Sequence, residues 1–241
     1  MRTESVTYKV NHLKMVGYLA YDETQSDKRP GILVYPDARG LGDHAKGVAE
    51  KLAGLGYIAL ACDLHGGGRL ILESTERAEQ LKLLQSIPLG VATRAHGGLN
   101  VLRQRPELDP SRIAAIGYCI GGAMALELAR IGEDIAAVVA LHGKLVSTLP
   151  ASARKKIKSK ILACLGADDP HVPLQQRLDF EIEMRAEKVN WQMNIYGGVV
   201  HGFTTPGIEK FGDPNHNHYD PQADARSWSE MLALFKEVFH S

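Results

Sequence analysis

The sequence predicts an α/β protein with a doubly wound, mostly parallel sheet, helices on both faces and an antiparallel hairpin near the N-terminus. Short apolar runs of strand length alternate with longer segments of helical periodicity, which is the order of elements in a parallel α/β sheet. Most of the short runs are apolar throughout, as expected for strands that helices cover on both faces. With 241 residues and 44% hydrophobic content, the chain can bury one large core.

The expected elements follow one another in a regular order. The segment TYKVNHLKMVGYLAY predicts the antiparallel hairpin. The expected core strands are GILVYP (31–36), YIALACD (57–63), RIAAIGY (112–118), IAAVVALH (135–142), KILACLG (160–166) and WQMNIYG (191–197). The expected helices are HAKGVAEKLAGLG, TERAEQLKLLQ, GVATRAHGGLNVLRQR, GGAMALELARIG, PLQQRLDFEIEMRAEK and QADARSWSEMLALFKEVF. Because no repeat, low-complexity tract or linker interrupts this order, we expect a single domain over residues 1–241.

Net charge and cysteine content narrow the range of partners. The 28 basic and 28 acidic residues cancel, which removes the electrostatic footprint of a general nucleic-acid binder. The N-terminal segment lacks the pattern of a signal peptide, and no apolar run reaches the length of about 18 residues that a membrane span needs. The 3 cysteines are widely spaced and odd in number, which fits reduced thiols. We therefore expect a soluble cytoplasmic monomer or homodimer, with neither nucleic acid nor a membrane as partner.

One cysteine stands where a strand is predicted to turn into a helix, in the segment GYCIG (117–121). This is the thiol version of the nucleophile elbow, in which a strained backbone holds the nucleophile and flanking glycines allow close packing. The helix N-terminus favours the thiolate, and the N–H of Ile120 can donate to an oxyanion. Cys119 is therefore the candidate nucleophile, the alternative being a small buried cysteine in a glycine-rich turn. Cys62 and Cys164 lie in apolar strands and are expected to be inert core residues.

A cysteine nucleophile needs a base, and the base needs an acid that orients it. In this kind of fold they follow the nucleophile in the order acid, then histidine. The loop ADDPHVP offers Asp168 and Asp169, and the loop GVVHGFTTPG offers His201. Both loops follow predicted strands, at the edge of the sheet where ligands bind. The alternative for His201 is a solvated loop residue.

Five segments carry a resemblance: YPDARGLGDH, YIALACDLHGGG, GYCIGGAMAL, GADDPHVP and YGGVVHGF. Over nearly its whole length the chain resembles the dienelactone hydrolase family of the α/β-hydrolase fold. The resemblance implies a triad of Cys119, Asp169 and His201, and it selects Asp169 because this residue stands four positions before Pro173. It also implies attack on an ester or lactone carbonyl, an acyl-thioester intermediate, and hydrolysis by water that His201 activates. No cofactor is expected.

The turn at residues 36–40 carries two further implied roles. By the resemblance, the backbone N–H of Ala38 is the second oxyanion donor, beside that of Ile120. Asp37 stands where family members usually carry a glutamate that modulates the nucleophile. The alternative for Asp37 is a turn aspartate that bonds its own backbone.

Four more residues are candidates for the pocket wall: Arg39, Tyr118, His142 and Phe203. His142 ends a predicted strand on the side of the site, and it could equally be a core histidine. The segment DPNHNHYDP (213–221) matches no standard zinc spacing, so we expect no metal. The segment HGGGRL lacks the lysine and hydroxyl residue of a phosphate loop, which favours a flexible loop near the pocket.

We expect a cysteine hydrolase of small esters or lactones. One alternative is a phosphotriesterase-like or promiscuous hydrolase that uses the same triad, and another is a non-catalytic binding protein on a hydrolase fold. Family members that hydrolyse dienelactone hold its carboxylate with two arginines. The matching positions here carry Thr205 and Ala78. Arg77 is next to Ala78 in sequence, so its side chain leaves the helix about 100° away from that of Ala78. We therefore expect uncharged esters to be better substrates than dienelactone, with Arg39 the one residue that could rescue anion binding.

Overall fold

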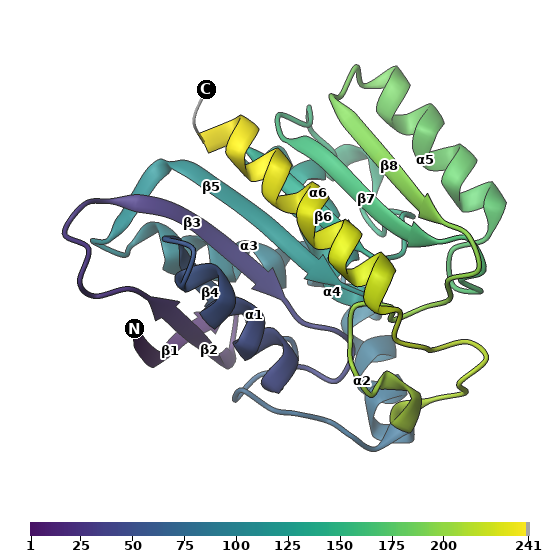
Figure 1. Ribbon diagram of the computed structural model, residues 1–241, viewed down its shortest axis with the longest axis horizontal. Coiled ribbons are helices and arrows are strands. Elements are labelled where there is room, and N and C mark those ends of the chain that lie inside the picture. The colour runs from purple at the N-terminus through teal and green to yellow at the C-terminus, as the bar shows by residue number, and fades with distance from the viewer. Residues whose placement is uncertain (240–241) are drawn as a thin grey trace.

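A computed structural model describes residues 1–239 of the protein. Within this range the strands form one eight-stranded sheet in the order β1-β2-β4-β3-β5-β6-β7-β8 (Figure 1). The strands are β1 (Arg2–Val10), β2 (Leu13–Tyr21), β3 (Arg29–Tyr35), β4 (Ile58–Ala61), β5 (Leu108–Tyr118), β6 (Ala137–Leu141), β7 (Lys160–Gly166) and β8 (Trp191–Tyr196). β2 pairs antiparallel with β1 and β4, and the remaining strand pairs are parallel. The predicted N-terminal hairpin and mostly parallel sheet are confirmed.

The observed strands differ from the predicted ones only at their ends. β5 begins at Leu108, ahead of the predicted start at residue 112; Leu108 is buried, but Asp109, Pro110 and Ser111 after it are partly or fully exposed. Hydrophobic patterning could not reveal that extension. β6 ends at Leu141, because His142 adopts a φ of 41° that is incompatible with a strand.

Helices cover both faces of the sheet. They are α1 (Asp43–Ala53), α2 (Ser74–Ser86), α3 (Gly90–Arg103), α4 (Ile120–Arg130), α5 (Leu174–Ala186) and α6 (Pro221–Phe239), with short 3-10 helices η1 (Ala151–Ala153) and η2 (Ile208–Phe211). α1 and α6 pack on one face, and α3 and α4 pack on the other (Figure 1). Each of the six predicted helices is present.

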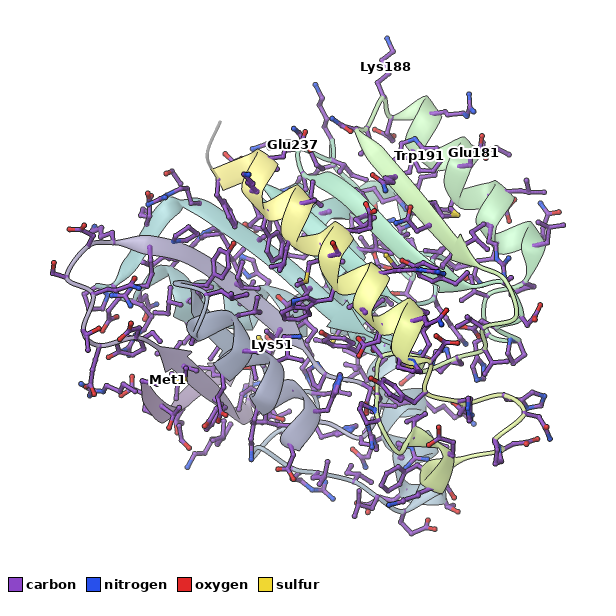
Figure 2. All side chains as sticks on the ribbon, viewed as in Figure 1. Met1, Lys51, Glu181, Lys188, Trp191 and Glu237 are labelled. Carbon is purple, nitrogen blue, oxygen red and sulfur yellow. The ribbon has the colours of Figure 1, made fainter. Side chains whose placement is uncertain are left out.

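The sheet separates two apolar cores, as β3 illustrates. Ile32 and Val34 face the core beneath α1 and α6, while Leu33 and Tyr35 face the core beneath α3 and α4. Figure 2 shows the charged side chain of Lys188 pointing outward from the molecule. None of the helices within residues 1–239 combines the length and the hydropathy that crossing a membrane requires. The carboxyl ends of the parallel strands lie at one edge of the sheet, and there the expected site residues meet.

Candidate active site

Cys119 occupies the turn between β5 and α4. Its φ of 56° and ψ of −118° are unusual for a residue with a side chain. A Cβ at Gly117 would lie 1.9 Å from the carbonyl oxygen of Gly121. A Cβ at Gly121 would lie 2.3 Å from the carbonyl oxygen of Tyr35. Close backbone packing therefore requires both glycines, and the strand-turn-helix arrangement expected around Cys119 is present.

The three cysteines differ in exposure. Cys119 is partly exposed, whereas Cys62 and Cys164 are fully buried. Burial raises the pKa of Cys62 far above its ordinary value and raises that of Cys164 to about 12. Both buried thiols are therefore unreactive at neutral pH, as expected of core cysteines.

Asp169 and His201 meet through a direct hydrogen bond. The Nδ1 of His201 lies 2.8 Å from the Oδ2 of Asp169. The other oxygen of Asp169 accepts a hydrogen bond from the backbone N–H of His171 at 2.8 Å. Asp169 is only 3% exposed, whereas Asp168 is exposed to solvent. The loops after β7 and β8 thus bring together the acid and the histidine that the sequence analysis selected.

The surroundings of His201 favour its protonated form. Burial alone would lower the pKa of His201. The negative charges of Cys119 and Asp169 and the hydrogen bonds to both residues have the opposite effect. These outweigh burial and raise the pKa to about 10. The protonated imidazole of His201 is therefore favoured where the sulfur of Cys119 carries a negative charge.

The loop of residues 213–218 supports the backbone of His201. The N–H of His201 donates to the carbonyl oxygen of His216 at 3.1 Å, and the N–H of His218 donates to the carbonyl oxygen of His201 at 3.1 Å. The imidazoles of His216 and His218 face neighbouring carboxylates. Within residues 1–239, no group of three His, Cys, Asp or Glu side chains is arranged to hold a metal ion. This supporting role was missed in the sequence analysis, because no local pattern reports a contact between distant backbones.

Asp37 and Arg39 form an ion pair in the turn after β3. The Nη2 of Arg39 lies 2.5 Å from Oδ2 of Asp37, and its Nε and backbone N–H donate to Oδ1 at 3.0 and 2.8 Å. Burial would raise the pKa of Asp37, but the hydrogen bonds and charge of Arg39 hold it below its ordinary value. The guanidinium carbon of Arg39 also lies 4.7 Å from the centre of the Phe211 ring. Asp37 thus bonds the backbone of its own turn, as the alternative interpretation expected, and it also borders the space around the thiol.

A small pocket of about 90 Å³ contains the thiol, and we call it the thiol pocket. Cys119, His201 and Ala38 contribute to its wall. The carbonyl oxygen of Ala38 accepts a hydrogen bond from Nε2 of His65 at 2.9 Å, which fixes the orientation of this turn. His65 belongs to the HGGGRL segment, so that segment does lie near the pocket.

The expected wall residues divide between two spaces. His142 lines the thiol pocket, Tyr118 lines a larger cavity beside it, and Arg39 lines both. Phe203 requires a correction, because it is fully buried and lines neither space. Its ring packs 5.2 Å from that of His142, within the core beneath α6. His142 itself is buried, with its ring 5.0 Å from that of His201.

Arg77 requires a second correction. We expected Arg39 to be the one residue that could rescue anion binding, with Arg77 about 100° away from the family position on its helix, yet Arg77 also lines the thiol pocket. Carbonyl oxygens of Leu72 and Phe211 accept hydrogen bonds from its guanidinium at 3.0 and 3.4 Å. Thr205 also lines the thiol pocket, while Ala78 is exposed. Contacts outside α2 direct Arg77 inward, and helical position alone does not predict them.

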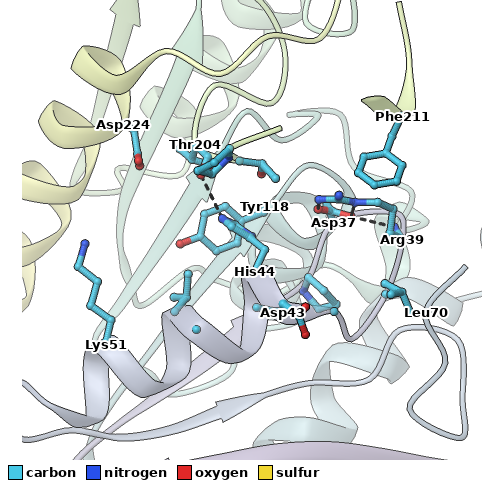
Figure 3. Close-up of a pocket in the computed structure, with 18 of the residues that line it drawn as sticks. Asp37, Arg39, Asp43, His44, Lys51, Leu70, Tyr118, Thr204, Phe211 and Asp224 are labelled. Atoms are coloured by element: carbon cyan, nitrogen blue, oxygen red, sulfur yellow. Dashed lines mark hydrogen bonds and ion pairs between the residues drawn. The ribbon is translucent and has the colours of Figure 1, made fainter. Parts of the chain in front are cut away.

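The larger cavity has a volume of about 590 Å³ and lies between α1, α6 and the loop that follows β3. We call it the large cavity. Figure 3 shows Asp37 and Arg39 with Phe211 at one end, and Lys51 with Asp224 at the other. No motif in the sequence indicated it, since its walls come from segments that are far apart along the chain.

The sequence model of the dienelactone hydrolase family matches residues 15–239. The chain belongs to the dienelactone hydrolase family. It is accordingly a hydrolase of the carboxylic ester class, and its sheet and helices form an α/β-hydrolase fold.

Solved structures of the dienelactone hydrolase type share the complete fold. One, named m3DLH, is 40% identical with a TM-score of 0.94, and the match covers 98% of each chain. A second, a dienelactone hydrolase-like promiscuous phosphotriesterase from metagenomic libraries, is 38% identical with a TM-score of 0.92, again over 98% of each chain. A protein of Synechocystis provisionally named carboxymethylenebutenolidase is 24% identical, over 98% of this chain and 97% of its own.

Proposed function

We propose that the protein hydrolyses small esters or lactones, with Cys119 as nucleophile, His201 as general base and Asp169 as the carboxylate that orients the base. One observation carries the proposal. The 2.8 Å hydrogen bond between Asp169 and His201 lies beside a partly exposed thiol at the N-terminus of α4. A nucleophile beside a base that is held by an acid is the arrangement that acyl transfer requires. The fold alone would not support this activity, because the same fold carries many functions.

The first half of the proposed reaction forms a thioester. The Cys119 thiolate attacks the carbonyl carbon, and the carbonyl oxygen takes up the negative charge. The backbone N–H groups of Ala38 and Ile120 are the proposed donors to this oxygen. The imidazolium of His201 then gives its proton to the departing alkoxide, so an alcohol leaves and the acyl group stays on sulfur.

The second half releases the acid. Neutral His201 takes a proton from water, the resulting hydroxide adds to the thioester carbonyl, and the Cys119 thiolate departs. The thiolate and the imidazolium are thereby restored. Asp169 keeps the imidazole oriented and stabilises its charged form through the hydrogen bond to Nδ1.

Selective labelling and turnover test the proposal together. Iodoacetamide should add one group to the native protein, at Cys119, because Cys62 and Cys164 are buried. Hydrolysis of ethyl acetate, followed in a pH-stat, should fall on the order of 10³-fold or more in Cys119→Ser. The matched control, Cys164→Ala, should keep its activity. Equal labelling of all three thiols, or unchanged turnover in Cys119→Ser, would show the proposal to be wrong.

A second candidate activity is phosphotriester hydrolysis. The observation that favours it is the 38% identity and the shared fold with the promiscuous phosphotriesterase structure. A thiolate beside oxyanion donors can attack phosphorus and expel an aryloxide, leaving a phosphoryl group on sulfur. Release of p-nitrophenolate from diethyl p-nitrophenyl phosphate, with a matching mass increase on Cys119, tests this activity separately from ester hydrolysis.

We further propose a single domain, because one sheet joins the elements from β1 to β8. A cytoplasmic location is supported by the three free cysteines, of which two are buried. We further propose that the protein is a monomer or a homodimer, and light scattering on the purified protein distinguishes these two states.

A further inference from the structure

The thiol pocket is too small for a complete substrate. Its volume is only about 90 Å³. The neighbouring large cavity, with about 590 Å³, falls within the range of about 300–1,000 Å³ that is usual for ligand sites. Atoms of the substrate beyond the reacting ester group therefore need space next to the thiol pocket.

Four residues border both spaces, namely Asp37, Arg39, Thr205 and Phe211. Thr205 is buried and adds a fixed part of this shared wall. Arg39 spans another part, because it bonds Asp37 on one side and packs against the Phe211 ring on the other (Figure 3). Arg39 and Phe211 thus contribute side chains, which have alternative rotamers, to the wall that the two spaces share.

Beyond this shared wall the large cavity is lined largely by apolar groups. Tyr118 and Trp228 supply aromatic surface from β5 and α6. Leu70 and Leu72 lie on its rim and are 48% and 54% exposed. Lys51 covers the ring of Trp228, with its ammonium nitrogen 3.6 Å from the ring centre. Exposed apolar side chains around a hollow with a few charged neighbours are typical of sites for apolar ligands.

We propose that the large cavity binds an apolar acyl or alkoxy group of the substrate once Arg39 and Phe211 have moved aside. The enzyme then selects esters with an apolar chain of about six carbons over the smallest esters. Each methylene that leaves water contributes roughly a fourfold factor in binding, so four fully buried methylenes would give about 250-fold. Because burial is incomplete and ordering the chain costs entropy, we expect a preference of about 10- to 100-fold. This inference rests on the proposed function, because it takes hydrolysis at Cys119 as given.

Gly47 allows the large cavity to be filled. It lies within α1 and lines the cavity, and no atom is found within 4 Å of a Cβ placed there. Gly47→Leu therefore projects a side chain into open space and replaces glycine with a better helix former. Gly197→Leu is the matched control, because Gly197 also has open space around its Cβ but follows β8 and does not line the cavity.

Three neutral esters test the selection: ethyl acetate, hexyl acetate and ethyl hexanoate. In wild type we expect kcat/KM for at least one six-carbon ester to exceed that for ethyl acetate by about 10- to 100-fold. A preference for hexyl acetate places the alkoxy group in the large cavity, and a preference for ethyl hexanoate places the acyl group there. The ratio of kcat/KM for the preferred six-carbon ester to kcat/KM for ethyl acetate should fall close to one in Gly47→Leu and stay at the wild-type value in Gly197→Leu.

Trp228 supplies a readout that does not need turnover. The chain has 2 tryptophans, and the other, Trp191, lies in β8. In a protein carrying Cys119→Ala and Trp191→Phe, titration with the preferred six-carbon ester should change the fluorescence of Trp228, and adding Gly47→Leu should remove the change.

The two readouts separate the inference from the proposed function. Equal ester ratios in wild type and Gly47→Leu, together with no fluorescence response, overturn the inference even if ethyl acetate turnover requires Cys119. If turnover does not require Cys119, the proposed function fails, and the Trp228 titration alone decides whether the large cavity binds apolar groups.

Discussion

The Nδ1 of His201 lies 2.8 Å from the Oδ2 of Asp169, while the neighbouring Asp168 is exposed. The two aspartates should therefore respond differently to the same substitution. Asp169→Asn leaves the volume intact but loses the charge that orients and stabilises the imidazolium, a change that costs on the order of 10⁴-fold in a serine-protease triad. We expect a loss of kcat approaching that size for Asp169→Asn and less than about threefold for Asp168→Asn. Similar losses in both variants would contradict the assignment.

The raised pKa of His201 makes stability depend on pH. This pKa is about 10 in the folded protein against an ordinary value of 6.5, so the native state binds the proton more tightly than the unfolded chain does. The resulting stabilisation is fully present below pH 6.5 and is lost as the pH rises through about 10. The free energy of unfolding of wild type, relative to His201→Gln, should therefore fall by at most about 1.4 kcal/mol per pH unit across this window. Urea unfolding at several pH values measures the difference, and a constant difference would refute the prediction.

Asp37 and Arg39 should influence the thiol in opposite directions. The carboxylate of Asp37 offsets the charge of Arg39, whose guanidinium also interacts with the charge of Cys119. Asp37→Asn removes the negative charge and leaves the positive one, which favours the thiolate. We expect iodoacetamide to label Cys119 several-fold faster in Asp37→Asn than in wild type at pH 7.

The double variant Asp37→Asn/Arg39→Gln serves as the control for this prediction. It removes both charges, so its labelling rate should return towards that of wild type. An unchanged rate in Asp37→Asn would mean that Asp37 acts only as a turn residue.

The packing at Gly121 predicts a large effect from a single methyl group. The Cβ in Gly121→Ala would lie 2.3 Å from the carbonyl oxygen of Tyr35, so β3 and α4 would have to separate. We expect a loss of more than about 2 kcal/mol in the free energy of unfolding. Gly47→Ala is the matched control, since its Cβ meets no atom within 4 Å, and it should stabilise α1 by about 0.5–1 kcal/mol. Urea unfolding of both variants measures these changes. If Gly121→Ala is as stable as wild type, Gly121 does not pack against the backbone of Tyr35 as described.

The fold could be predicted from the sequence because its core strands are buried on both faces. Such strands are apolar throughout, as Ile32 to Tyr35 are, and patterning locates them. The extension of β5 to Leu108 escaped prediction, since Asp109, Pro110 and Ser111 interrupt the apolar run. The turn around Cys119 could be predicted for another reason. Backbone segments approach each other closely there, which requires glycine at positions 117 and 121, and both glycines are visible in the sequence.

The residues around the triad were harder to predict than the triad itself. Arg77 reaches the thiol pocket through contacts with Phe211, and His65 bonds Ala38 across 27 positions. Phe203 follows His201 closely in sequence, yet it turns into the core beneath α6. Contacts of this kind depend on how distant segments pack, and neither spacing nor periodicity along the chain records them.

The last prediction concerns the charge of the substrate. The charge of Arg39 is neutralised by Asp37, and the hydroxyl of Thr205 cannot replace a guanidinium. Arg77 also lines the thiol pocket, and its guanidinium bonds only carbonyl oxygens, with no carboxylate partner within residues 1–239. We expect a neutral ester to be hydrolysed faster than a carboxylate-bearing lactone, and the remaining activity on the anion to depend on Arg77. Losing one charge-assisted hydrogen bond costs roughly 1.5–3 kcal/mol, so Arg77→Gln should lower kcat/KM for the anionic lactone by about 10- to 150-fold, and that for ethyl acetate far less. An anionic lactone that is the better substrate in wild type, and stays so in Arg77→Gln, would show that a different group binds its carboxylate.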